Sequence, residues 1–312
     1  MIGRNTIVKA FGYTTNGGPE VQQFLDLEIP TPLPGELLVQ VRAAGVNPVD
    51  WKIRSGMYGA TPPADLPGVL GSEVSGIVRA VGPDVDDFRV GDEVFGTVAS
   101  GSGGYAEYTL TTADATAPKP TQVSFTDAAT LAVAGATAYD GVTQLQLKPG
   151  QTLLVNGVSG GVGVAAAQIA RDLDINVIGI AGADKQPLAE SLGATFVAYG
   201  DGAADRIRAI MPDGVDAIFD LAGGEGLRAV AGLLTDRSKL ITAGDPQTAT
   251  ELGGHMIERD RTRHVLALVG HLAAAGKLDP HVEDILSLDQ AAEAIAAVEV
   301  GHAKGKVVIQ IS

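Results

Sequence analysis

Short runs of alternating apolar and polar residues fill the first third of the chain. The alternation is clearest over residues 36–43, where every second side chain from Leu37 is apolar, as in a β-strand that buries one face. Further apolar runs lie at 74–81 and 92–98, and turns rich in Pro and Gly, such as Pro62-Pro63, separate them. Many short strands joined by tight turns predict a small β-barrel or sandwich.

The pattern changes near Ser124. We expect a helix to start there with Thr126 or Asp127 as its cap, and apolar strands then alternate with helical stretches. The expected strands lie at 152–156, 176–181, 195–199, 215–220 and 239–242, with helices at 162–173, 185–192, 204–210 and 225–234. Further helices at 265–275 and 289–298 precede a last strand at 306–311. The central run of βα units predicts a parallel sheet covered by helices on both faces.

The bulk composition removes several classes of function. The chain has 312 residues, which favours two domains. Its formal net charge of −15 gives it no electrostatic means of holding nucleic acid or an anionic bilayer as a whole. It contains no cysteine, which excludes disulfides, thiolate-bound zinc, iron–sulfur clusters and a cysteine nucleophile. No run approaches the roughly 20 apolar residues of a membrane span, and the N-terminus does not resemble a signal peptide. We therefore expect a cytoplasmic protein with no nucleic-acid or membrane partner.

A glycine-rich turn follows the strand expected at 152–156. It contains Gly157, Gly160 and Gly163 and leads into a helix. In a dinucleotide site one such glycine makes a tight turn, one lets the backbone approach a pyrophosphate, and one lets the helix pack closely. The helix N-terminus adds free N–H groups and a partial positive charge. The spacing is G-x-x-G-x-x-G rather than G-x-G-x-x-G, and an ordinary βα turn is the alternative, but the flanking strands and helix favour a dinucleotide site. We expect the backbone contacts to come from Ser159, Gly160, Gly161 and Val162.

The end of the second strand of this region bears on the choice of dinucleotide. An NAD site usually places Asp or Glu there to accept hydrogen bonds from the ribose, but this chain has Ala181. Without that carboxylate a 2′-phosphate meets no repulsion, and both Lys185 and Tyr199 can contact it. The alternatives are a solvated helix residue for Lys185 and a half-buried strand end for Tyr199, while Asp184 is either a helix cap or a ribose partner. We favour NADPH over NADH.

Further motifs run through the chain in a fixed order: AGVNPVD (44–50), IRSGMY (53–58), LPGVLGSE (66–73), GIV (76–78), VGDEVFG (90–96), GYAEY (104–108), ATAY (136–139), the glycine turn and GHAKGKVV (301–308). Together they resemble the zinc-free quinone oxidoreductase branch of the medium-chain dehydrogenase/reductase superfamily over nearly the whole length. The resemblance implies an α/β fold, in which a Rossmann doubly wound parallel sheet is inserted in a GroES-like β-barrel domain. The implied domains are a GroES-like substrate domain at 1–123, a Rossmann cofactor-binding domain at 124–264, and a segment at 265–312 that completes the substrate domain.

The zinc ligands of the superfamily's alcohol dehydrogenases are replaced in this chain. Their Gly-His-Glu motif has Ser72 in place of the histidine, and their cysteine position falls near Asn47. The four-cysteine lobe is also missing, so we expect no metal. Without a Lewis acid an alcohol has no ready route to deprotonation. Reduction of a quinone or an activated double bond needs only stabilisation of charge on the carbonyl oxygen, followed by its protonation.

The candidate substrate and nicotinamide contacts each have a plainer alternative. Asn47 either donates its amide to the substrate carbonyl or is a turn residue before a proline. Tyr58 either donates its hydroxyl or stacks on a ring, or it anchors a loop. Thr137 and the pair Ala243-Gly244 lie on the nicotinamide side by resemblance, with a helix-face hydroxyl and a plain turn as their alternatives. Some relatives have a second tyrosine where this chain has Trp51-Lys52, so its pocket departs from theirs.

The leading hypothesis is an NADPH-dependent, zinc-independent reductase that transfers a hydride to a small quinone. The second hypothesis is the same chemistry on an α,β-unsaturated carbonyl (an enone), with hydride delivered to the β-carbon. An NADPH-binding module without turnover is a third hypothesis, and a Rossmann protein that binds no nicotinamide is a fourth. The resemblance also implies a homodimer paired through a Rossmann edge strand, but the charged segment at 251–262 argues against that pairing.

Overall fold

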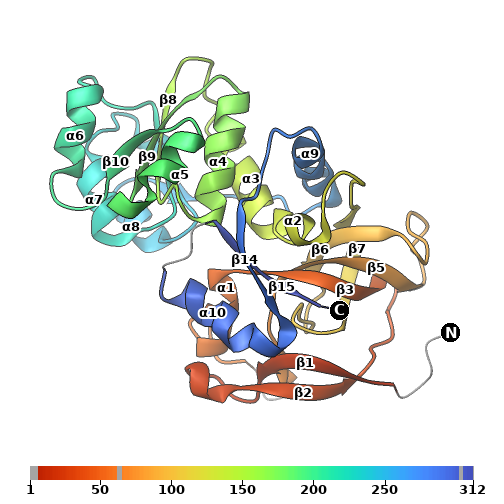
Figure 1. Cartoon of the computed structure of the whole chain (residues 1–312). Helices are drawn as coiled ribbons and strands as arrows, with labels where there is room; N and C mark the ends of the chain where they lie inside the picture. Colours follow the sequence, from red (N-terminus) through yellow and green to blue (C-terminus); the bar gives the residue numbers. More distant parts are fainter. Residues whose placement is uncertain (1–5, 62–64, 302–304, 312) are drawn as a thin grey trace. The chain divides into compact units, whose positions relative to one another are not determined.

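The alternating run that begins at Glu36 forms strand β3 (Glu36–Val46) of a six-stranded sheet in the computed structural model (Figure 1). The structure describes residues 6–61, 65–301 and 305–311, so the expected Pro62-Pro63 turn and His302 lie outside the described residues. The chain divides into two units: residues up to 133 with 261–274 and those from 282 on, and residues 134–260 with 275–281. The predicted domain boundaries, after residues 123 and 264, stay a prediction.

The first unit is built on the strand order β14-β15-β3-β5-β6-β7. Strand β3 also pairs with β7, so that β3, β5, β6 and β7 close on themselves as a barrel. The C-terminal strand β15 pairs antiparallel with the end of β3, residues 43–46, on the edge opposite β5. The unit contains β1 (Ile7–Tyr13), β2 (Gln22–Glu28), α1 (Pro48–Ser55), β4 (Gly68–Val69), β5 (Glu73–Val81), β6 (Glu93–Val98), β7 (Tyr108–Pro118), α2 (Phe125–Ala128), α9 (Arg263–Ala274), β14 (Val282–Ser287), α10 (Ala291–Glu299) and β15 (Lys306–Gln310).

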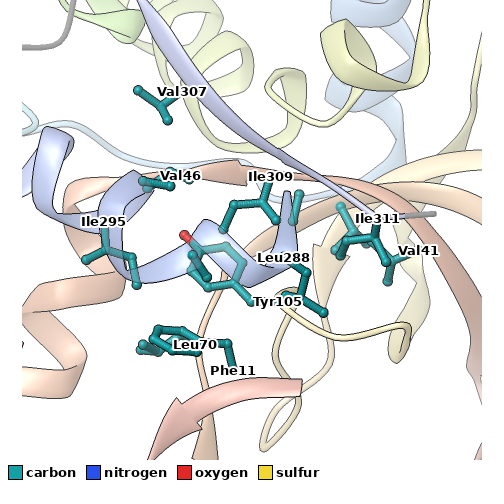
Figure 2. Packing of buried hydrophobic residues seen from close by; sticks show 14 of the residues in the cluster. Phe11, Val41, Val46, Leu70, Tyr105, Leu288, Ile295, Val307, Ile309 and Ile311 are labelled. Carbon is teal, nitrogen blue, oxygen red and sulfur yellow. The ribbon is translucent and has the colours of Figure 1, made fainter. Parts of the chain in front are cut away.

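Residues from both ends of the sequence share the main core of this unit (Figure 2). Phe11 and Val41 come from early strands, whereas Ile295 comes from α10, and Val307 and Ile309 come from β15. All five are at least nine-tenths buried. Burial of a side chain of this size contributes roughly 1.5–3 kcal/mol, so the early strands of this unit depend on the C-terminal ones for much of their packing.

The second unit is a parallel sheet with the order β10-β9-β8-β11-β12-β13. The chain moves outward from β8 in one direction and then returns to move outward in the other, which is the doubly wound Rossmann topology. This confirms the predicted fold class. The unit contains α3 (Ala136–Gln144), β8 (Thr152–Asn156), α4 (Gly161–Asp172), β9 (Asn176–Ala181), α5 (Gln186–Ser191), β10 (Thr195–Ala198), α6 (Ala203–Ile210), β11 (Ala217–Asp220), α7 (Gly224–Ala231), β12 (Leu240–Thr242), α8 (Pro246–Glu251) and β13 (His255–Met256).

One local expectation was wrong, and one helix was not predicted. The helix near residue 124 begins at Phe125, and its cap is the Ser124 hydroxyl, which accepts from the Asp127 N–H at 3.0 Å. Thr126 and Asp127 therefore lie inside the helix, because a hydroxyl can cap only the N–H groups two or three residues after it. The segment after Asn47, for which no helix was predicted, forms α1, with a proline at its first position and a left-handed glycine at its end.

The charged segment 257–260 turns away from the edge strand β13 and packs on α3. The Arg259 guanidinium donates to the Asp140 carboxylate at 3.0 Å and to the Thr137 hydroxyl, and Asp140 also accepts from the Asp260 N–H at 3.1 Å. The Arg259 charge is thus used within the unit, whereas Glu258 and Asp260 are exposed, and the argument against pairing at this edge stays a prediction. The edge strand β13 itself has only two residues. The homodimer stays a prediction.

Removal of Glu299 tests the tie between α1 and α10. Arg54 is 0% exposed, and its Nη2 donates to both oxygens of Glu299 at 2.9 and 3.1 Å. Glu299→Ala would leave a buried guanidinium without its counter-charge, so we expect urea denaturation to show a loss of about 2 kcal/mol. Glu293→Ala, at an exposed position of the same helix, should change the unfolding free energy by less than about 0.5 kcal/mol. Equal losses in both variants would contradict this account.

Candidate functional site

The glycine turn joins β8 to α4 at the carboxyl edge of the parallel sheet. Gly157 has φ of 96°, a left-handed conformation that only glycine adopts without strain. The N–H groups of Gly157 and Val158 donate to the carbonyl oxygen of Ile180 at 3.0 and 3.1 Å, which ties the turn to β9. Helix α4 starts at Gly161, and its first intrahelical bond, from Val164 to Gly160, leaves the earlier N–H groups of the first turn for a ligand.

The other two glycines of the motif meet different surroundings. A Cβ on Gly163 would lie 2.3 Å from the Gly157 carbonyl oxygen and 2.6 Å from the Val158 Cα, so the helix rests directly on the turn. A Cβ on Gly160 would meet nothing closer than 3.7 Å, and this residue is exposed. On β9, Gly179 is needed because a Cβ there would lie 2.7 Å from the Val158 side chain. The turn is therefore packed on its inner side and open at Gly160, as close approach of a phosphate requires.

Three polar residues at the ends of neighbouring strands stiffen this edge. Asp220 ends β11, is 0% exposed, and accepts from Asn156 Nδ2 at the end of β8 and from the Thr242 hydroxyl at the end of β12, each at 2.7 Å. The same carboxylate accepts from the Gly223 N–H at 2.9 Å. Because the Thr242 hydroxyl also accepts from the Gly244 N–H at 3.0 Å, the predicted contact pair Ala243-Gly244 has a fixed backbone.

A cavity of about 340 Å³ opens at the carboxyl ends of β8, β9 and β10. Its lining includes Asn156, Ile180 and Tyr199. Tyr199 is 59% exposed rather than half-buried. The volume is within the range of small-molecule sites, and the crevice outside the carboxyl ends of the strands is where doubly wound sheets bind ligands.

The remaining predicted cofactor residues of the second unit have differing exposure. Ala181 ends β9 and is 6% exposed. Lys185 is not a solvated helix residue, because its side chain is 11% exposed and its Nζ lies 3.6 Å from the Asp184 carboxylate. Thr137 is 5% exposed, and its hydroxyl accepts from Arg259. Ser159, Gly161 and Val162 are half-buried along the turn and first helical residues.

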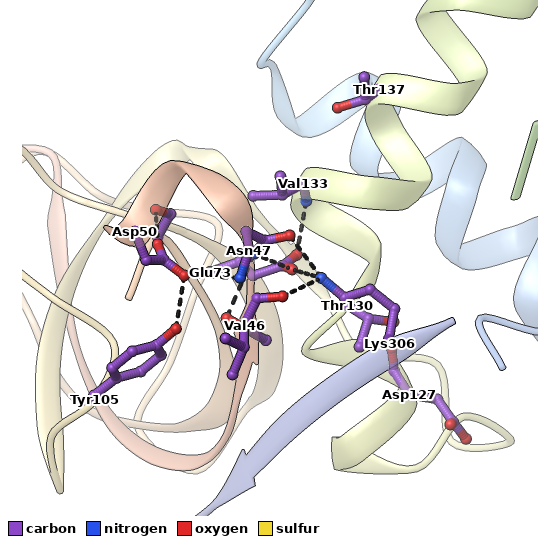
Figure 3. A network of polar contacts seen from close by, with 12 residues as sticks. Val46, Asn47, Asp50, Glu73, Tyr105, Asp127, Thr130, Val133, Thr137 and Lys306 are labelled. Carbon is purple, nitrogen blue, oxygen red and sulfur yellow. Dashed lines mark hydrogen bonds and ion pairs between the residues drawn. The ribbon is translucent and has the colours of Figure 1, made fainter. Parts of the chain in front are cut away.

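A buried polar network lies in the first unit (Figure 3). The Lys306 ammonium donates to Asn47 Oδ1 at 2.6 Å, to Glu73 Oε1 at 3.0 Å and to the Val46 carbonyl oxygen at 3.1 Å. Asn47 Nδ2 donates to the same Glu73 oxygen at 2.8 Å, and the Val133 N–H donates to the other at 2.7 Å. Asn47 and Lys306 are each 4% exposed and Glu73 is 0% exposed, so these charges neutralise each other out of contact with water.

Asp50 extends the network through α1. Its carboxylate accepts from the Asn47 N–H at 2.9 Å, from the Tyr105 hydroxyl at 2.6 Å and from the Ser72 hydroxyl at 2.5 Å. Burial raises the pKa of Asp50 to about 6, although these hydrogen bonds favour the ionised form. Burial and the neighbouring Asp50 charge likewise raise the pKa of Tyr105 well above its usual range. Sequence reasoning assigned no role to Lys306 or Tyr105, and for Asp50 and Glu73 it favoured structural hydrogen-bond acceptors over general bases.

The two candidate catalytic residues, Asn47 and Tyr58, differ in their exposure to solvent. Asn47 is a member of the buried network, whereas Tyr58 follows the end of α1 and is 66% exposed beside the similarly exposed Met57. Trp51 packs against the main core, and the Lys52 ammonium lies 5.8 Å from the centre of its ring. The roles of Asn47 and Tyr58 stay predictions. Among the described residues, no group of three or more His, Asp or Glu side chains is placed to hold a metal ion.

Comparisons with known proteins agree with this architecture. Residues 33–121 match the model of the alcohol dehydrogenase GroES-like domain, and residues 192–309 match that of a zinc-binding dehydrogenase. The chain is 38% identical over 239 residues to the quinone oxidoreductase of Pongo abelii, covering 74% of this chain and 71% of that protein. It is 31% identical to the 2-methylene-furan-3-one reductase of Solanum lycopersicum, covering 97% and 79%. The solved Escherichia coli quinone oxidoreductase complexed with NADPH is 27% identical with a TM-score of 0.87, covering 97% and 99%.

No helix of the described chain is both long and apolar enough to cross a bilayer.

Two glycine substitutions test whether the turn is tightly packed at Gly163 and open at Gly160. We expect Gly163→Ala to lower the unfolding free energy by about 1–3 kcal/mol, because the new methyl group overlaps the Gly157 carbonyl. Gly160→Ala adds a methyl group with no neighbour inside 3.7 Å and should leave thermal unfolding within a few degrees of the wild type. A Gly163→Ala melting temperature no lower than that of Gly160→Ala would contradict the packing argument.

The pKa of Asp50 predicts a pH-dependent stability difference. The folded pKa of about 6 lies above the ordinary value of 3.8, so ionising Asp50 costs stability as pH rises through this window. Relative to Asp50→Asn, whose side chain does not ionise, the wild type should lose about 2 kcal/mol between pH 4 and pH 7. Urea denaturation of both proteins across this range measures the difference. Stability curves that stay parallel with pH would show that Asp50 titrates normally.

Proposed function

We propose that this chain, which belongs to the quinone oxidoreductase branch of the medium-chain dehydrogenase/reductase superfamily, transfers a hydride from NADPH to a small quinone without a metal. The chain is an oxidoreductase by this membership. The observation that carries the proposal is the glycine turn, closed by packing at Gly163 and open at Gly160 at the carboxyl edge of a doubly wound sheet.

The residues of the turn fit a dinucleotide. The exposed backbone at Gly160 and the first N–H groups of α4 would bind the pyrophosphate, and the α4 dipole adds a partial positive charge there. A side chain at Gly160 would occupy space that the ligand needs. Thr137 and the pair Ala243-Gly244 are proposed to position the nicotinamide, which supplies the hydride when bound.

The preference for NADPH rests on three residues of the second unit. Ala181 ends β9 without the carboxylate that would accept from an unphosphorylated ribose and repel a 2′-phosphate. Lys185 offers the positive charge, and Tyr199 offers an exposed hydroxyl on the lining of the cavity. The solved Escherichia coli quinone oxidoreductase in complex with NADPH supports the same assignment by similarity.

Hydride addition places negative charge on the carbonyl oxygen of the substrate, and this charge must be stabilised and then protonated. We propose that Asn47 donates an amide N–H to that oxygen, while Tyr58 donates its hydroxyl or stacks on the substrate ring. By resemblance, Ser72 takes the place of a zinc-binding histidine of the superfamily's alcohol dehydrogenases and Asn47 lies near their cysteine position, and neither is a ligand that zinc prefers. A quinone fits this set, because its reduction to the hydroquinone consumes one hydride and one proton.

An enone is the second candidate substrate. The Solanum lycopersicum protein named as a 2-methylene-furan-3-one reductase matches 97% of this chain, and an enone needs the same carbonyl donor. Hydride then adds to the β-carbon and a proton to the α-carbon. The two candidates therefore differ in the substrate and share the proposed protein groups.

Steady-state oxidation of NADPH with a panel of quinones and enones tests the function. We expect turnover with quinones that a chelator does not reduce, and tighter binding of NADPH than of NADH in a titration of both. A preference of a hundredfold or more for enones would transfer the assignment to the second candidate. Binding of NADPH without oxidation across the panel would instead show a cofactor-binding module, and tighter NADH would refute the cofactor assignment.

A charge at residue 181 tests the selection of the dinucleotide. Ala181→Asp should weaken NADPH binding at least tenfold while NADH binding stays within about threefold, because only NADPH carries the 2′-phosphate near the new carboxylate. Ala181→Asn is the matched control with nearly the same shape and no charge. Isothermal titration of both nucleotides gives the ratio. Equal weakening of NADPH by Asp and Asn would show that size, rather than charge, matters at this position.

A further inference from the structure

We propose that Lys306 and Glu73 are positioning residues that fix the orientation of the Asn47 amide and leave one of its N–H groups for the substrate oxygen. The inference rests on the proposed function, since it assigns partners to a group proposed to touch the substrate. It adds to that proposal the reason why a nearly buried asparagine would present a donor rather than an acceptor (Figure 3).

Lys306 has no hydrogen left to give a substrate. Its ammonium carries three N–H donors, and they go to Val46 O, Asn47 Oδ1 and Glu73 Oε1 at 2.6–3.1 Å. Glu73 is 0% exposed, and both of its carboxylate oxygens already accept hydrogen bonds. Neither charged residue can therefore contact a ligand directly, and each acts only through its neighbours.

The amide of Asn47 is held from both ends by opposite charges. Its oxygen accepts from the Lys306 ammonium at 2.6 Å, and its nitrogen donates to Glu73 at 2.8 Å. A flipped amide would aim its NH₂ at the ammonium and its oxygen at the carboxylate, so both contacts would become repulsive. The orientation of an asparagine amide is assigned from its hydrogen-bond partners. Lys306 and Glu73 together allow only one orientation of the Asn47 amide.

The fixed orientation leaves one donor weakly used. An amide nitrogen carries two hydrogens, and the second contact of Nδ2 is the Gly45 carbonyl oxygen at 3.4 Å, beyond the usual 2.7–3.2 Å range. The ammonium on the oxygen also polarises the amide, which strengthens its N–H groups as donors. Within this network, Asn47 thus has a polarised N–H available for an oxygen that develops negative charge.

A triple-variant cycle tests the positioning role. Lys306→Met alone would strand the Glu73 charge in the interior and could unfold the chain, so the Glu73→Gln/Lys306→Met double variant removes both charges together. Asn47→Ala removes the amide. We expect the double variant and Asn47→Ala each to lower kcat about 10- to 100-fold, with the NADPH Kd within about twofold of the wild type. Adding Asn47→Ala to the double variant should lower kcat by no more than about threefold further, because residues that act as one unit are not additive.

The matched control is a second lysine–glutamate pair of the same unit. The Lys119 ammonium lies 3.0 Å from the Glu93 carboxylate, and the Lys119 side chain is 5% exposed. Glu93→Gln/Lys119→Met should leave kcat within about twofold, and Asn47→Ala should cost its full effect in that background. The pair at Lys119 thus controls for loss of a buried lysine together with its glutamate partner, although Glu93 itself is 45% exposed.

The inference would be overturned if the losses of kcat multiplied when Asn47→Ala is combined with Glu73→Gln/Lys306→Met. It would also be overturned if the Glu73→Gln/Lys306→Met double variant kept the wild-type kcat. A double variant that lowers kcat only in step with the NADPH Kd or the melting temperature would also overturn it, since that is the result of a purely structural role. These failures all require an active wild type. A wild type without turnover on the quinone and enone panel refutes the proposed function itself, and the assigned substrate contact falls with it.

Discussion

One buried ammonium, that of Lys306, sets the constraint on which the first unit depends. An unpaired charge cannot remain in a protein interior, because desolvation costs several kcal/mol per ion. The Lys306 ammonium therefore needs the Glu73 carboxylate on β5 and the oxygens of Val46 and Asn47 at the end of β3 as acceptors. The backbone N–H of Val133 donates to the second oxygen of Glu73. Segments that are far apart in the sequence meet here because each supplies a hydrogen-bond donor or acceptor that a buried group of another segment needs.

The second unit follows the same rule with neutral partners around a single carboxylate. Asn156, Asp220 and Thr242 end three adjacent parallel strands and satisfy one another, so the carboxyl edge of the sheet is rigid without help from a ligand. In each of these two networks the charged side chains already have their hydrogen-bond partners. What stays open is modest, namely the backbone at Gly160 in the second unit and, as proposed above, one N–H of Asn47 in the first. The Gly160 backbone suits the permanent charge of a pyrophosphate, whereas the Asn47 N–H suits charge that appears only transiently on the substrate.

The sequence predicted the parts whose pattern is local. The strands at 152–156 and 176–181 and the glycine turn have the expected bounds, because buried parallel strands are continuous apolar runs and the turn needs small residues at fixed places. The polar network of the first unit was missed, because its members lie far apart in the sequence. Lys306 had only the appearance of the first residue of a strand, and no local signal distinguishes it from a solvated lysine. Helix α1 was not predicted, because Asn47 was considered as a substrate contact or as a turn residue before Pro48.

The position of β15 in the chain has a consequence for the order of folding. Lys306 lies 233 residues after Glu73 and 259 after Asn47, and the whole parallel sheet is encoded between them. During synthesis the early strands must therefore wait, with the Glu73 carboxylate uncompensated, until nearly the entire second unit has emerged. Contacts of such long sequence separation form slowly, whereas the βα units can fold as they appear. The growing chain thus carries a first unit whose core and buried charge pair are complete only when its last strand has been added.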